Sequence, residues 1–254
     1  MTNSGLPDPA NAFRRQRARN RRLTESGPKW RRNPIVVFLV DLLGILLTAL
    51  ILSLLIKTFL VRSFYIPSGS MLNTLQINDR IVVNELVPNV VPIERGDVVV
   101  FRDPGGWLGP VTKPAVPFWT QAQDWFLSAF GVIAPDSDVH LVKRVIGLPG
   151  DHVKCCDATH HVIVNGVPIT EDYVIKGALP STVEFDVTVP ANSIWVMGDN
   201  RDNSEDSRFH KDLPSKGFVD KKFIVGRAIF ISWPFGHVTW LDNHSDVFKN
   251  VPNP

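Results

Sequence analysis

Residues 35–56 read IVVFLVDLLGILLTALILSLLI, with a single charged side chain, Asp41. A helix of this length spans roughly 33 Å at about 1.5 Å per residue, which matches the hydrocarbon core of a bilayer. The run is too long for the apolar segment of a cleaved leader, and no small-x-small cleavage site follows at residues 58–61. The stretch therefore predicts an uncleaved transmembrane anchor within residues 34–61.

The segment before this span, residues 1–33, carries nine basic side chains against two acidic ones, a net charge of +7. The whole chain carries only +2, so the remainder is acidic, at −5. An arm of this composition is expected to be disordered by itself. Nucleic-acid binding would suit its charge, but its place beside an apolar span favours a cytoplasmic flank under the positive-inside rule. We expect the chain after the anchor to lie outside the cytoplasm, and no nucleic-acid partner.

The chain beyond the anchor has the pattern of strands. Short runs rich in Val, Ile and Phe, separated by turn residues, predict strands at residues 80–84, 97–101, 139–146, 182–189, 194–197 and 223–233. Asn165-Gly166, between apolar runs at 162–164 and 167–169, is typical of a type I′ hairpin. Pro168 makes the second of these runs a candidate edge strand. The predicted fold class is mainly β, an antiparallel, barrel-like body behind one helix.

Residues 103–138 depart from this pattern, with five prolines and six aromatic side chains. Residues 121–130 are compatible with a short amphipathic helix. Two interpretations stay open for the aromatic residues: contact with lipid headgroups, or a local cluster packed on the β body.

The two cysteines, Cys155 and Cys156, are adjacent. Two free thiols and a labile vicinal pair are both compatible with that spacing. No CxxC or HExxH pattern occurs, so the sequence predicts no zinc site.

A serine follows the anchor closely, and a lysine lies inside a strand-like apolar run. Ser70 is part of a Ser-Gly-Ser turn, which by itself indicates only a loop. Lys143 and Arg144 are expected on opposite faces of their strand, so that one is buried and the other reaches water. Burial lowers the pKa of a lysine, and a neutral amine can accept a serine proton. Both cations at the surface is the alternative.

Four segments, in order, resemble the sequence boxes of type I signal peptidases (leader peptidases), which are Ser-Lys dyad serine proteases. They are PSGSMLNTL at 67–75, GDVVVF at 96–101, KRVIGLPGD at 143–151 and GDNRDNSEDSR at 198–208. The resemblance covers roughly residues 35–235. One departure is Asn73, where the family usually has proline, and we expect it to loosen the turn.

The resemblance implies a role for each matching residue. Ser70 would be the nucleophile and Lys143 its general base, while the Ser68 hydroxyl and the Ser70 backbone N–H would form the oxyanion hole. Ser204 would hydrogen-bond the Lys143 amine and orient it. Supporting roles fall to Asp199, Asp206 and Arg208, with Asp206 and Arg208 paired. A small S1 pocket would be lined by Ile66, Met71, Leu75 and Leu141, and an S3 pocket by Phe64, Ile66 and Val142.

The resemblance also implies a function and an organisation. The enzyme would cut signal peptides from exported preproteins after Ala-x-Ala, without cofactor or metal, at the outer face of the cell membrane. Its partners would be preprotein signal peptides, the lipid bilayer and the export translocase. Only seven residues separate Arg62 from Ser70, so the site is expected near the membrane surface. The expected parts are the arm (1–33), the anchor (34–61), the catalytic core (62–150 and 193–236), a smaller β region (151–192) and a tail (237–254).

Several alternatives remain at this stage. A Ser-His-Asp triad is disfavoured because His140 is expected on the strand face opposite Lys143. A self-cleaving repressor-type peptidase would carry a DNA-binding domain instead of an anchor. An organelle inner-membrane peptidase and a non-catalytic tethered module of the same fold are the others.

Overall fold

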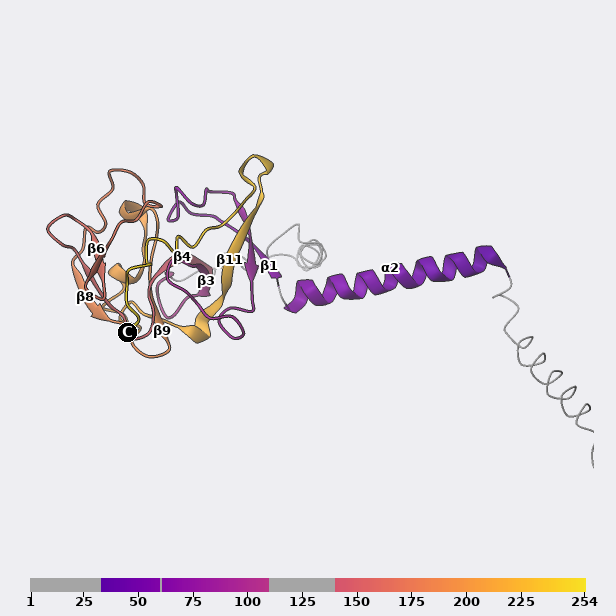
Figure 1. Cartoon of the computed structure of the whole chain (residues 1–254), viewed down its shortest axis with the longest axis horizontal. Helices are drawn as coiled ribbons and strands as arrows, with labels where there is room; N and C mark the ends of the chain where they lie inside the picture. Colours follow the sequence, from indigo (N-terminus) through magenta and orange to yellow (C-terminus); the bar gives the residue numbers. More distant parts are fainter. Residues whose placement is uncertain (1–32, 60, 110–139) are drawn as a thin grey trace, which may run out of the picture. The chain divides into compact units, whose positions relative to one another are not determined.

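The computed structural model describes residues 33–59, 61–109 and 140–254. The predicted arm up to residue 32 and the predicted helix at 121–130 lie outside these ranges. Residues up to Leu55 form one compact unit and residues from Ile56 onward another, and each is described separately (Figure 1).

The first unit contains helix α2 (Pro34–Phe59). Its window Pro34–Ser53 has a mean hydropathy of 2.9, and none of it is buried against protein. The predicted helix is confirmed, and it is long and apolar enough to cross a membrane.

The second unit is mainly β, as predicted, and its larger sheet is antiparallel (Figure 1). The strand order is β1-β2-β11-β3-β4-β9-β10, and β12 pairs with β11. The bounds are β1 (Val61–Tyr65), β2 (Arg80–Asn84), β3 (Val98–Arg102), β4 (His140–Gly147), β9 (Ser193–Met197), β10 (Val219–Asp220), β11 (Ile224–Trp233) and β12 (Thr239–Trp240).

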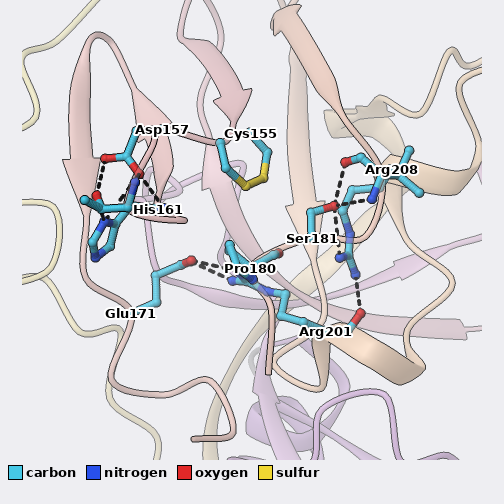
Figure 2. The surroundings of a disulfide bond; sticks show 11 residues. Cys155, Asp157, His161, Glu171, Pro180, Ser181, Arg201 and Arg208 are labelled. Carbon is cyan, nitrogen blue, oxygen red and sulfur yellow. Dashed lines mark hydrogen bonds and ion pairs between the residues drawn. A yellow bond between two sulfur atoms is a disulfide. The ribbon is translucent and has the colours of Figure 1, made fainter. Parts of the chain in front are cut away.

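A second, four-stranded sheet has the order β7-β6-β5-β8. Its strands are β5 (His152–Cys155), β6 (Val162–Val164), β7 (Val167–Ile169) and β8 (Phe185–Thr188). The turn between β6 and β7 has positive φ at both Asn165 and Gly166, as a type I′ turn requires. Strand β7 is an edge strand, which leaves the missing N–H of Pro168 without a ladder bond to lose. Cys155 and Cys156 form a disulfide at the end of β5 (Figure 2).

Short 3-10 turns connect the later strands. They are η3 (Arg201–Asn203), η4 (Ser207–Phe209), η5 (Lys221–Phe223) and η6 (Phe235–His237).

Strand β3 is buried on both faces and divides the core of the large sheet. Val99 and Phe101 pack into one cluster, and Val98 and Val100 into another. The second cluster also takes in Ile66, Met71 and Leu75 from the segment after β1. The segment that carries Ser70 is therefore held on the sheet by its own apolar side chains.

The segment after β12 packs back onto the body. Phe248 and Val251 are buried in the cluster that covers the smaller sheet. The Asn243 carbonyl oxygen lies so close to Gly96 that a Cβ there would be 1.7 Å from it. This close approach, at a φ of +88°, explains why the GDVVVF segment begins with glycine.

The start of the 103–138 segment also packs on the body. The Asp103 carboxylate accepts hydrogen bonds from the backbone N–H groups of Gly105, Trp107 and Leu108. Trp107 is buried and its ring stacks on His210 with centroids 4.4 Å apart. For Trp107, the interpretation as part of a packed cluster is therefore the right one. The other aromatic residues of this segment lie outside the described residues.

Candidate active site

The serine turn follows β1 and reverses the chain tightly. Leu72 N–H donates to the Gly69 carbonyl, and Leu75 N–H donates to the Met71 carbonyl. Asn200 holds the turn from outside: its backbone N–H donates to the Ser70 carbonyl at 3.1 Å, and its side chain to the Gly69 carbonyl at 2.8 Å. The position of Ser70 is thus fixed by the 198–208 segment as well as by its own turn.

Lys143 comes from the middle of β4, opposite Val99 of β3. Its side chain is buried, with 4% exposed, and its Nζ donates a hydrogen bond of 2.8 Å to Ser70 Oγ. Burial lowers the pKa of Lys143 from 10.5 to about 8, although Asp206 and Asp199 oppose this shift. The structure therefore brings together the two residues to which the sequence assigns the chemistry.

The Ser68 hydroxyl lies 3.4 Å from Ser70 Oγ on the same turn. Ser68 is exposed, whereas Ser70 is half-buried. The Ser68 hydroxyl therefore lies on the solvent side of Ser70, where an incoming carbonyl group has access to both hydroxyls.

The hydrogen bond predicted between Ser204 and Lys143 is absent. Ser204 Oγ is buried and has no hydrogen-bond partner within the described part of the chain. It lies against Gly198 instead: a Cβ on Gly198 would be 2.2 Å from Ser204 Oγ and 2.5 Å from the Ser70 carbonyl oxygen. Ser204 thus reaches the correct corner of the site, but it does not contact the amine.

The predicted pair of Asp206 and Arg208 is present. Arg208 donates from Nε and Nη2 to the two carboxylate oxygens of Asp206, at 2.8 Å each. Asp206 also accepts a hydrogen bond from Gly198 N–H at 2.9 Å, and Arg208 donates to the Arg201 carbonyl at 3.0 Å. Burial disfavours the Asp206 charge, but the Arg208 hydrogen bonds and charge hold its pKa below the usual value. The pair therefore closes the loop that carries Ser204, and Ser181 lies beside Arg208 (Figure 2).

Arg144 does not reach water, contrary to the prediction. It is fully buried, and it donates from Nε and Nη2 to the two oxygens of Asp199 at 2.9 and 2.7 Å. Thr74 donates to Asp199 as well, which joins the serine turn to the same pair. The sequence concealed this arrangement because the partners are 55 residues apart along the chain.

A cavity of about 250 Å³ opens beside Ser70 and Lys143. It is lined by five of the six predicted pocket residues, Phe64, Ile66, Met71, Leu141 and Val142, and also by Tyr65, Pro67, Ser68, Leu108 and His140. Leu75 is the exception: it is fully buried in the core and does not line the cavity. His140 does line it, on the same side as Lys143, with its ring centroid 5.1 Å from that of Phe64. The prediction that the strand turns His140 away from Lys143 is therefore wrong.

Asn73 does not loosen the turn. Its φ is +88°, in the left-handed region that asparagine tolerates and proline cannot adopt. Its side-chain amide donates to the Tyr173 carbonyl at 2.9 Å. The departure from the family pattern thus comes with a tether of its own.

Metal-binding groups are not gathered at this site. Within the described ranges, no cluster of three or more His, Cys, Asp or Glu side chains has a metal-binding arrangement. A buried lysine amine hydrogen-bonded to a serine hydroxyl is the arrangement found in serine hydrolases that use lysine in place of histidine.

Comparisons with known proteins identify the family. A family model described as "Signal peptidase, peptidase S26" matches residues 39–233. Signal peptidase I of Mycobacterium tuberculosis H37Rv is 38% identical over 191 residues, which cover 66% of this chain and 64% of that protein. Signal peptidase I of Leptolyngbya laminosa is 34% identical over 169 residues, covering 66% of this chain and 67% of that protein. The chain belongs to the signal peptidase family, peptidase S26.

A solved structure gives a weaker likeness. The signal peptidase I of Enterococcus faecalis is 25% identical, with a TM-score of 0.33, and the match covers 53% of this chain and 95% of that one. The chain thus spans somewhat less than two thirds of the Mycobacterium relative, and the activity of a whole signal peptidase is a proposal for it.

Proposed function

We propose that this chain is a membrane-anchored serine endopeptidase that removes signal peptides from exported preproteins by a Ser-Lys dyad. The observation that carries the proposal is the 2.8 Å hydrogen bond between Lys143 Nζ and Ser70 Oγ, made by a buried amine beside a cavity. Membership of the signal peptidase family supports the class of substrate.

The chemistry begins with a neutral Lys143 amine. It accepts the proton of the Ser70 hydroxyl as the oxygen attacks the scissile carbonyl carbon. The oxyanion that develops accepts hydrogen bonds from the Ser68 hydroxyl and the Ser70 backbone N–H. The Lys143 ammonium then returns the proton to the leaving amine, which leaves an acyl ester on Ser70. A water molecule, deprotonated by the same amine, hydrolyses this ester.

The cavity supports a preference for small side chains before the cut. Its volume of about 250 Å³ is shared between the scissile group and the flanking residues, and its walls at Ile66, Met71 and Leu141 are apolar. We propose that it accepts alanine at the first and third positions before the bond. The remaining substrate would lie extended along the segment that carries the serine.

The anchor and its flank support the location. Helix α2 is apolar enough to span a bilayer, and the +7 arm before it favours a cytoplasmic N-terminus. Exposed aromatic side chains at Trp233, Phe235 and Trp240 support an additional contact of the catalytic unit with the outer lipid surface. Trp233 pairs across the sheet with Arg80, which pairs with Tyr65 at the entrance to the serine turn.

A cleavage assay tests the proposal. The full chain in detergent should release the signal peptide of a preprotein that ends in Ala-x-Ala, and Ser70→Ala and Lys143→Ala should each abolish cleavage. Ser245→Ala and Lys249→Ala replace exposed residues of the same types and should cleave normally. Thermal unfolding shows whether the inactive variants are folded. Full activity in folded Lys143→Ala would falsify the dyad.

A further inference from the structure

Tyr173 lies outside the four sequence boxes, in the connection that follows β7, yet it contacts two of them. It is buried, with 3% of its surface exposed. Its ring covers the Arg144 guanidinium, with the central carbon 4.2 Å from the ring centroid. Its carbonyl accepts the 2.9 Å hydrogen bond from Asn73. Tyr173 therefore touches the neighbour of Lys143 on one side and the turn of Ser70 on the other.

The Tyr173 hydroxyl extends the contact to the last box. It donates to Glu171 Oε1 at 2.6 Å. Glu171 accepts two further hydrogen bonds from Arg201, at 2.6 and 2.7 Å, and both side chains are nearly inaccessible (Figure 2). Arg201 in turn donates to the Gly198 carbonyl at 3.0 Å. The Glu171–Tyr173 pair thus joins the serine turn, the lysine strand and the Ser204 loop.

We propose that Tyr173 is a positioning residue of the proposed active site: its ring fixes the Arg144 guanidinium against Asp199, and its carbonyl fixes the serine turn. The inference rests on the proposed function for its kinetic consequences. A fully buried guanidinium is held in place by its counter-ion and by an aromatic face. Without the ring, Arg144 gains room to move and water reaches the ion pair.

Movement of Arg144 is felt at the catalytic amine through charge. Lys143 is faced by carboxylates of Asp206, Asp199 and Glu205 and by the Arg208 guanidinium. Arg144 neutralises Asp199, so a displaced Arg144 leaves more negative charge beside the amine. That charge, together with the entry of water, stabilises the ammonium form of Lys143. The groups that face Tyr173 itself are Glu171, Arg144, Arg201 and the His244 ring, which pairs with Asp172.

The test compares two substitutions of Tyr173 in the full chain. Tyr173→Phe keeps the ring over Arg144 and loses only the hydroxyl, so its kcat should stay within about twofold of wild type. Tyr173→Leu removes the ring, and we expect kcat to fall about tenfold with KM nearly unchanged. The pH midpoint of kcat should rise by about half a unit or more in Tyr173→Leu alone. Leu179→Ala, an exposed site on the same connection, should match wild type.

Two further measurements keep the inference testable whatever the stability of Tyr173→Leu or the activity of the wild type. Asn73→Gly cuts only the tether to the Tyr173 carbonyl and suits the positive φ, so it should lower kcat by about threefold. An NMR titration of the Lys143 ε-carbon reports the midpoint without any substrate. If the wild type failed to cleave, the proposed function would fall, whereas an upward shift in this titration would still support the role of Tyr173. An unchanged midpoint in folded Tyr173→Leu, or a Tyr173→Phe variant equally impaired, would overturn it.

Discussion

Arg144 and Asp199 form a two-point ion pair in which neither side chain is exposed, and Arg144 directly follows Lys143 on β4. Arg144 also donates to the Gly96 carbonyl at 2.7 Å and to the Asp242 carbonyl at 3.3 Å. This guanidinium therefore joins four separate parts of the chain beside the general base.

Removing one charge of this pair should be costly. Asp199→Asn leaves the buried Arg144 without its counter-ion, and we expect the free energy of unfolding to fall by about 3–5 kcal/mol. Denaturant unfolding measures the change. Asp202→Asn, an exposed site on the same loop, serves as the control and should stay within about 0.5 kcal/mol of wild type. Equal stability of the two variants would show that the pair contributes little.

The cleavage rate should depend on the protonation of Lys143. Its pKa is lowered by burial to about 8, so the neutral amine predominates only above that pH. We expect kcat to rise through a midpoint near pH 8 and to level off above it. A pH–rate profile on an uncharged peptide substrate tests this, and a midpoint near pH 6 would point to a histidine instead.

Replacing the same lysine should make the protein more stable while it inactivates it. Below pH 8 the folded state carries a buried ammonium, and a pKa lowered from 10.5 to about 8 corresponds to a cost of about 3 kcal/mol. Lys143→Met removes this cost, so its unfolding temperature at pH 7 should exceed that of wild type. The advantage should shrink as the pH rises from 8 to 10.5, because the wild-type amine is then neutral in the folded state. A constant difference across this range would contradict the assignment.

Gly198 should not tolerate a side chain. The Cβ of Gly198→Ala would be 2.2 Å from Ser204 Oγ and 2.5 Å from the Ser70 carbonyl oxygen, so the nucleophile must shift. A displacement of this kind should lower kcat about 100-fold. Gly236→Ala is the matched control, since a Cβ there meets nothing within 4 Å. Wild-type rates in both variants would mean that the corner is more adaptable than its geometry indicates.

Two apolar residues assigned to the pocket should behave differently. Leu75→Ala creates a hole in the core and should cost about 2–5 kcal/mol of stability while leaving the substrate preference unchanged. Val142→Ala widens the cavity, and we expect faster cleavage of peptides with larger side chains three residues before the bond. Peptide-library cleavage and thermal unfolding separate the two effects. A changed preference in Leu75→Ala would return that residue to the pocket.

The features that the sequence predicted well are those with a local cause. Asn165-Gly166 specifies its turn by its own backbone preferences, and the apolar run of α2 specifies its own helix. Strand β2 was predicted with its observed bounds, because Arg80–Asn84 is a β-branched run between turns. The strands that were missed, β1, β5, β10 and β12, are short or rich in polar residues, and pairing with neighbours stabilises them.

The site was predictable only where the family resemblance supplied the partners. The resemblance paired Ser70 with Lys143, which are 73 residues apart. The burial of Arg144 and the contacts of Tyr173 depend on packing between distant segments, and no local pattern indicates them. Ser204 was assigned a contact that requires a particular side-chain direction, which sequence alone does not define.

The segment after β12 has a consequence for biosynthesis. The carbonyls of Asp242 and Asn243 close over Arg144 and Gly96, and the Pro252 carbonyl accepts hydrogen bonds from Arg95 and Asn165. These contacts form only after the ribosome has released the last residues and they have been delivered to the same compartment. A partly synthesised chain therefore lacks the completed corner, and the proposed protease stays inactive until its own translation has finished.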